Sequence, residues 1–96
     1  MNKSKVASEK KFKIKIEYCG VWGVGGKLQC AKIITKYYFP NAEIQTKISD
    51  EDGAFEIYFI TEDGKEILVH SKLQGEGYLE GVEKSEKYRD KIKELL

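Results

Sequence analysis

The sequence contains few of the residues that carry metal, disulfide or membrane chemistry. Its 96 residues include one histidine, one proline and two cysteines. The cysteines are far apart in dissimilar contexts, which argues against a disulfide framework, and one histidine with a distant cysteine does not make a metal site. No apolar run is long enough for a signal-peptide core or a membrane-spanning helix. We therefore expect a soluble protein of a reducing compartment, with no metal and no membrane partner.

An excess of one charge is also lacking. Seventeen basic and sixteen acidic residues leave a formal net charge of +1, so no overall field attracts the chain to nucleic acid. The length suits one domain with a single core. Residues 1–11 carry four lysines and few large apolar groups and are predicted to form a flexible tail. The domain is predicted to span residues 12–96.

Two loops lack the residues that would make them ligand sites. Gly23-Val24-Gly25-Gly26 precedes a predicted helix but has no Gly-Lys-Ser/Thr ending, which argues against phosphate binding. Ser49-Asp50-Glu51-Asp52-Gly53 lacks the ligand spacing and the closing glutamate of a calcium loop. Neither nucleotide nor calcium is therefore expected as a cofactor.

Alternating apolar and charged residues give the clearest structural signal. Ile14 and Ile16 share one face of a predicted strand and Lys13 and Lys15 share the other, so only one side of the sheet should be covered. The second strand should be shorter than the first. The expected elements are, in chain order, a strand at 12–18, a helix at 27–39, strands at 44–48, 54–61 and 65–70, and a helix at 82–96.

This order predicts a two-layer α+β sandwich of thioredoxin-like β-α-β-β-β-α topology. A helix connects the first two strands, so they should be parallel, and the later strands should form a hairpin. The result is a four-stranded mixed sheet, with strand one central and two helices on one face. Cys30, Ile33 and Tyr37 share the apolar arc of the first helix and are expected to face the core.

Cys19 is the first candidate for chemistry. It lies where the first strand leads into the first helix, and there the free N–H groups of a helix start and the nearby Lys27 should favour a thiolate. Gly20 and Gly23 suggest an exposed loop that a partner can approach. The alternative is that Cys19 is a small buried residue at the end of a strand. For His70 we expect a local hydrogen bond rather than catalysis.

Five separated motifs follow one another in the chain. They are Tyr18-Cys19-Gly20-Val21-Trp22-Gly23, Leu28-Gln29, Gly53-Ala54-Phe55-Glu56-Ile57, Leu68-Val69-His70-Ser71-Lys72 and Gly75-Glu76-Gly77-Tyr78. In this order they resemble the selenoprotein W family over residues 12–96. The resemblance implies a thioredoxin-like fold, a cytosolic location, thiol redox chemistry linked to glutathione and, for some members, binding to 14-3-3 proteins.

The sequence departs from the family pattern at one decisive position. The family motif is Cys-x-x-selenocysteine or Cys-x-x-Cys, and Trp22 occupies its second redox position here. An indole cannot resolve a mixed disulfide. Either the protein is a monothiol member that leaves resolution to free glutathione, or Trp22 stands where the gene encodes selenocysteine, whose codon differs from that of tryptophan by one base. Whether the chain is a thiol oxidoreductase enzyme stays open for this reason.

Two functions follow from these motifs. In the first, Cys19 is the redox thiol of a glutathione-linked protein, with Trp22 at the second position of its motif. The residues expected to contact a partner are Gly20, Val21, Gly23, Gly75, Gly77 and Tyr78. In the second, the chain is a non-catalytic protein-binding module that uses an exposed loop around Trp22 as its anchor.

Overall fold

The computed structural model describes residues 6–20 and 25–96, and the elements follow the predicted order. The sheet has the strand order β2-β1-β3-β4, in which β1 and β2 are parallel and the β1–β3 and β3–β4 pairs are antiparallel. This confirms the mixed sheet with β1 central. The elements are β1 (Phe12–Cys19), α1 (Gly25–Tyr38), β2 (Ala42–Ser49), β3 (Phe55–Ile60), β4 (Glu66–Ser71) and α2 (Val82–Leu95).

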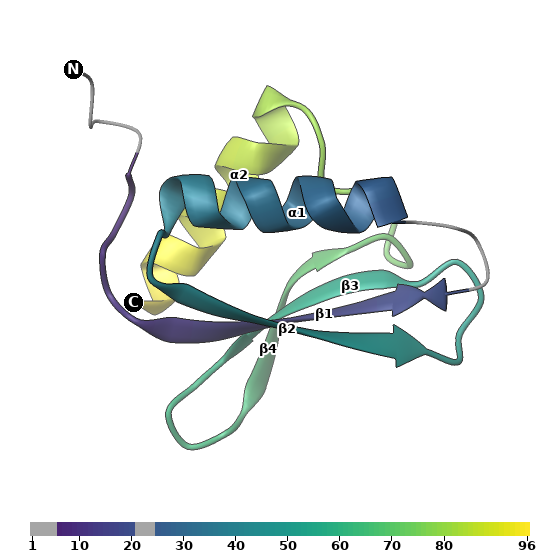
Figure 1. Ribbon diagram of the computed structural model, residues 1–96, viewed down its shortest axis with the longest axis horizontal. Coiled ribbons are helices and arrows are strands. Elements are labelled where there is room, and N and C mark those ends of the chain that lie inside the picture. The colour runs from purple at the N-terminus through teal and green to yellow at the C-terminus, as the bar shows by residue number, and fades with distance from the viewer. Residues whose placement is uncertain (1–5, 21–24) are drawn as a thin grey trace.

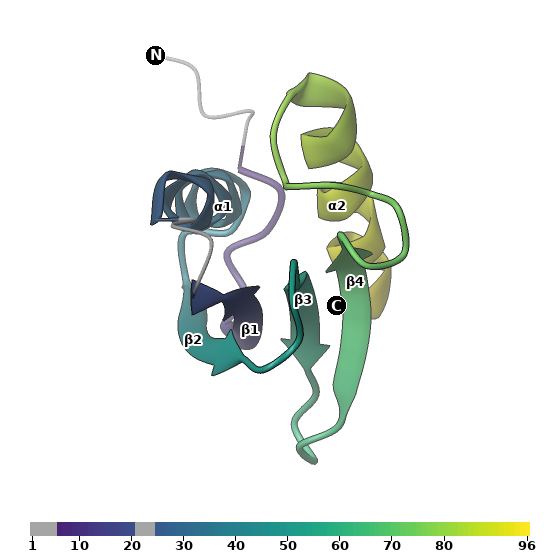
Figure 2. The same cartoon turned by 90° about the vertical axis from the view of Figure 1, so that its right-hand side faces the viewer.

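The two helices lie on the same face of the sheet (Figures 1 and 2), which confirms the two-layer α+β, thioredoxin-like sandwich. The alternation along β1 is the cause. Ile14 and Ile16 are fully buried, whereas Lys13 is exposed. Ile57 and Phe59 of β3 stand in register with the two isoleucines, so the apolar rows of neighbouring strands join beneath the helices.

The core lies between this apolar face and the helices. At one end of it, the Phe12 ring stacks on Phe59 and meets Phe39 edge to face, with both centroid distances 5.3 Å. Ala7 packs against the core, and its N–H donates to the carbonyl of Tyr38 at 2.7 Å. Residues 1–5 of the predicted tail lie outside the described residues, and the flexibility of the tail stays a prediction.

The predicted buried face of α1 is wrong in part. Ile33 is 66% exposed and Tyr37 is 50% exposed, while Ala31 and Thr35 are buried. Two helices side by side each contact the sheet through one narrow stripe, so part of the wide apolar arc of α1 is left facing solvent. Cys30, expected to be buried, is only half-buried for the same reason.

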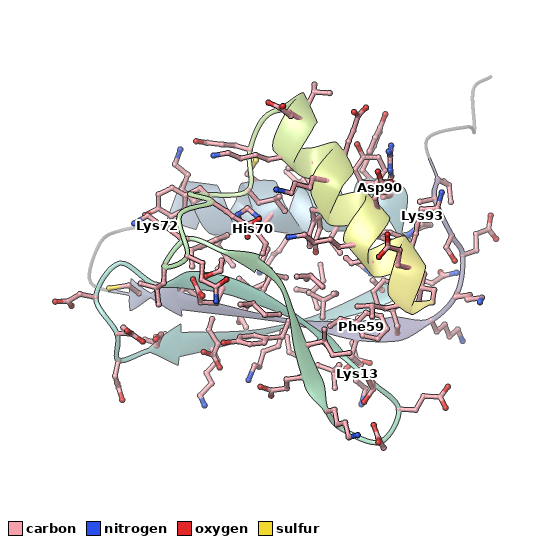
Figure 3. All side chains as sticks on the ribbon, turned by 180° about the vertical axis from the view of Figure 1, so that it is seen from behind. Lys13, Phe59, His70, Lys72, Asp90 and Lys93 are labelled. Carbon is pink, nitrogen blue, oxygen red and sulfur yellow. The ribbon has the colours of Figure 1, made fainter. Side chains whose placement is uncertain are left out.

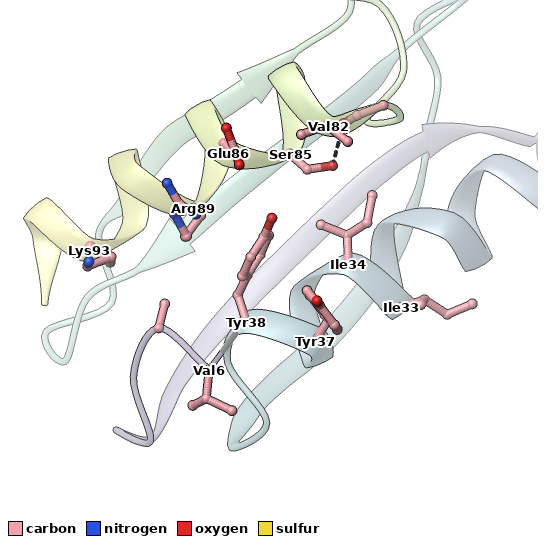
Figure 4. Close-up of a pocket in the computed structure, with 12 residues that line it drawn as sticks. Val6, Ile33, Ile34, Tyr37, Tyr38, Val82, Ser85, Glu86, Arg89 and Lys93 are labelled. Carbon is pink, nitrogen blue, oxygen red and sulfur yellow. Dashed lines mark hydrogen bonds between the residues drawn. The ribbon is translucent and has the colours of Figure 1, made fainter. Parts of the chain in front are cut away.

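The second strand also differs from expectation. β2 has eight residues, as many as β1, and is therefore not the shorter strand. In α2 the buried residues are Ser85, Tyr88 and Ile92, whereas Val82 is 73% exposed. Val82 borders a groove of about 640 Å³ between the two helices (Figure 4), and none of the predicted site residues that the structure describes lines it. Within the part of the chain described, neither helix is long and apolar enough to cross a membrane.

Candidate functional site

Cys19 is the last residue of the central strand. Its N–H donates to the carbonyl of Ala54 at 2.9 Å, and across the parallel ladder it is paired with Ser49. Only 2% of Cys19 is exposed. The alternative that it is a buried residue ending a strand therefore describes its surroundings, and a disulfide can reach the sulfur only after neighbouring groups move.

The second cysteine belongs to the first helix and not to this strand end. Cys30 is a half-buried residue of α1, and both cysteines are free thiols. Among residues 6–20 and 25–96, no group of three histidine, cysteine or acidic side chains is placed to hold a metal ion.

The predicted loop after Cys19 is only partly described. Val21, Trp22 and Gly23 lie outside the described residues. Gly20 is exposed, and a Cβ added to it would lie 3.4 Å from Cγ2 of Ile48, near the end of β2. Ile48 is itself 62% exposed. An accessible apolar side chain therefore adjoins the residue that follows Cys19.

Tyr78 is brought to this end of the molecule by aromatic and cationic contacts. Its ring meets Phe55 edge to face at a centroid distance of 5.2 Å. The ammonium groups of Lys27 and Lys72 each lie 5.3 Å from the centre of the Tyr78 ring. Phe55 follows Ala54, the residue hydrogen-bonded to Cys19. The structure thus places Tyr78 close to the strand end that carries the cysteine, together with the start of α1.

Gly75 and Gly77 shape the loop that carries Tyr78. Their φ angles are 97° and 70°, which glycine adopts without the cost that a Cβ imposes. Nε2 of His70 lies 2.9 Å from the carbonyl oxygen of Gly77 and, since a carbonyl only accepts, the imidazole must donate. His70 is buried, and its burial lowers the pKa of the imidazole below 6.5. The expected local hydrogen bond is confirmed.

Glu76, which lies between the two glycines, has its carboxylate close to lysine ammonium groups of α2. Its carboxylate accepts the N–H of Ser71 at 2.8 Å and lies 3.1 Å from the ammonium of Lys91. Burial alone would raise the pKa of Glu76, but these hydrogen bonds outweigh it, and the pKa is lowered. Glu76 and Gly75 line a hollow of about 290 Å³ against α2.

Glu56 is a polar core residue that the sequence did not single out as functional. It is buried in β3 opposite Glu17, accepts a hydrogen bond from the hydroxyl of Ser71, and accepts the N–H of Leu73 at 3.1 Å. The sequence signals were an acidic residue between apolar strand positions and its place in the motif Gly53-Ala54-Phe55-Glu56-Ile57. These hydrogen bonds hold the turn that begins at Lys72, directly after β4.

The β-α-β-β-β-α order and the central β1, with a cysteine at its end, define a thioredoxin-like domain. The sequence model of the Rdx family matches residues 13–94 of the chain. The chain belongs to the Rdx family, which includes selenoprotein W, and the predicted resemblance is confirmed. No curated protein matches the chain.

Proposed function

We propose that this Rdx-family module is a glutathione-linked thiol redox protein with Cys19 as its nucleophile. The observation that supports this most is the place of Cys19 at the carboxyl end of the central strand, directly before the connection to α1. In open α/β sheets, ligands are bound beyond the carboxyl ends of strands. A cytosolic location belongs to the same proposal, because free thiols persist in a reducing compartment.

The proposed reaction is thiol–disulfide exchange. The thiolate of Cys19 attacks one sulfur of oxidised glutathione, the glutathione S–S bond breaks, and a Cys19–glutathione disulfide forms. The departing glutathione thiolate takes a proton from water. Because Trp22 supplies no second thiol, a further glutathione thiolate must attack the mixed disulfide to restore Cys19.

Because Cys19 is buried, we expect this reaction to be slow. With 2% of the residue exposed, attack requires a local movement that uncovers the sulfur. The thiol should therefore react more slowly in the folded protein than in urea-unfolded chain at the same pH.

Oxidised glutathione applied to the wild type and to two matched variants, Cys19→Ser and Cys30→Ser, tests the assignment. Intact mass should show one glutathione adduct on the wild type and on Cys30→Ser, and none on Cys19→Ser. Added reduced glutathione should remove the adduct. An adduct that persists in Cys19→Ser and disappears in Cys30→Ser would assign the chemistry to α1 and contradict the proposal.

A second candidate function is a non-catalytic protein-binding module, which the shielding of Cys19 and the exposure of Ile48 favour. The resemblance suggests 14-3-3 proteins as partners, with the loop around Trp22 as anchor. Binding to an immobilised 14-3-3 protein should then be weakened in Ile48→Asp and kept in Cys19→Ser. If binding is absent from the wild type, or is unchanged in Ile48→Asp, this second candidate is wrong.

A further inference from the structure

Lys72 places a positive charge beside the strand end that carries Cys19. Its ammonium lies 3.5 Å from the position that a Cβ on Gly53 would occupy. Gly53 directly precedes Ala54, whose carbonyl accepts the N–H of Cys19 at 2.9 Å. Figure 3 shows Lys72 toward the end of the molecule at which β1 and β2 finish, away from Lys93. The cation and the cysteine therefore belong to one edge of the domain, although they are distant in sequence.

A second lysine ammonium lies close to the same ring as Lys72, that of Tyr78. Lys27 of α1 and Lys72 both hold their ammonium groups 5.3 Å from the centre of the Tyr78 ring. Such contacts favour a defined position for a flexible lysine. Lys27 is already engaged, since it donates to Glu80 at 2.7 Å, a bond that raises the pKa of its ammonium. Among the described residues, Lys72 has no carboxylate within 4.0 Å, so its charge is available to a ligand.

The other lysine cluster is less suited to an anion. Lys87 and Lys91 on α2 face Glu76, at 3.9 and 3.1 Å from its carboxylate. That carboxylate would repel a ligand of the same charge. Gly53, which the Lys72 ammonium approaches, carries by contrast neither a side chain nor a charge.

We propose that Lys72, supported by Tyr78 and Lys27, forms a binding site for a carboxylate of a small anionic disulfide or thiol of the glutathione type. The site rests on the proposed function in one respect, because it places that ligand for exchange with Cys19. No bond forms or breaks at Lys72 itself. Lys72 is a specificity-determining residue, which favours anionic over neutral or cationic disulfides.

Rates of mixed-disulfide formation with three disulfides test the charge preference. Oxidised glutathione is dianionic, 2-hydroxyethyl disulfide is neutral and cystamine is dicationic at neutral pH. Lys72→Gln should slow the reaction of oxidised glutathione about threefold to fivefold, leave 2-hydroxyethyl disulfide unchanged and speed cystamine. The matched control is Lys93→Gln, which removes one charge from the last turn of α2 and should leave all three rates unchanged.

Equal slowing of all three disulfides in Lys72→Gln, or no change in any of them, would overturn the site. Oxidised glutathione slowed to the same degree by Lys93→Gln would overturn it as well, because the effect would then belong to net charge.

A second measurement separates this inference from the reactivity of Cys19. S-Methylglutathione keeps both carboxylates but cannot exchange disulfides, so binding can be followed by amide NMR shifts. The amides of Lys72 and Tyr78 should shift in the wild type, and much less in Lys72→Gln. If Cys19 reacts with no disulfide yet these shifts occur, the proposed redox function fails and the carboxylate site stands. If no shifts occur at these residues, the site is overturned whatever Cys19 does.

Discussion

The hydroxyl of Tyr88 on α2 lies 2.7 Å from the hydroxyl of Thr35 on α1, and both residues are buried. The hydroxyl of Thr35 donates its one proton to the carbonyl of Ala31 at 2.8 Å, so Tyr88 must be the donor to Thr35. Burial raises the pKa of Tyr88 far above its ordinary value, which keeps the phenol neutral and able to donate. The two helices are thus joined by a directed polar bond within the core.

Tyr88→Phe should lower the free energy of unfolding by about 1 kcal/mol, because it removes this bond but leaves Thr35 bonded to Ala31. Thr35→Val should cost more, about 1 to 3 kcal/mol, because it leaves the buried Tyr88 hydroxyl without its acceptor. Urea unfolding followed by circular dichroism gives both values and that of the double variant. Strictly additive losses would show that the two hydroxyls are not coupled.

Stability should depend on pH through His70. Its burial lowers the pKa of the folded imidazole below 6.5, so as pH falls the unfolded chain takes up the proton first. The free energy of unfolding should therefore decrease from about pH 7 downward, by at most about 1.4 kcal/mol per pH unit, until the folded imidazole also titrates. Glu76 does not contribute in this range, because its lowered pKa keeps it ionised.

The matched variant for this effect is His70→Gln, which retains an N–H donor for the carbonyl of Gly77 but has no titrating ring. Its unfolding free energy should be nearly flat between pH 7.5 and pH 5.5, where the wild type slopes. Parallel slopes in the two proteins would mean that another group is responsible.

Trp22→Cys should give the protein a disulfide reductase activity that the present sequence lacks, because it restores the Cys-x-x-Cys spacing. Insulin reduction with dithiothreitol as the electron source measures the turnover. The double variant Cys19→Ser with Trp22→Cys should lose it. Equal turnover by wild type and Trp22→Cys would show that the second position is dispensable. Intact mass of the protein from its native source would show whether position 22 carries selenium.

The covered face of the sheet and the parallel first pair of strands were predictable from the sequence because they depend on local patterns. Ile14 and Ile16 alternate with lysines, and a helical run separates the first two strands, so one covered face and a parallel pair follow. The solvent-facing part of α1 was not predictable. Ile33 and Tyr37 belong to an apolar arc by spacing alone, and only the position of α2 decides which part of that arc is covered.

The candidate site was likewise predictable from the sequence only in part. Cys19 was located by its place between a strand and a helix, but its burial depends on tertiary packing that the spacing of residues does not encode. The contact of Lys72 with Tyr78, and its approach to Gly53, depend on how two loops fold toward each other. Periodicity contains no information about such contacts, because they join residues that belong to no common helix or strand.

The double pairing of β1 has a consequence for how the thiol can be uncovered. β1 is hydrogen-bonded to β2 on one side and to β3 on the other, so its middle cannot separate without loss of the whole sheet. Amide protons near Ile16 should then exchange with deuterium only through global unfolding, while those at the end of the strand exchange through smaller openings. A thiol at that end can be exposed and covered again many times while the rest of the domain remains folded.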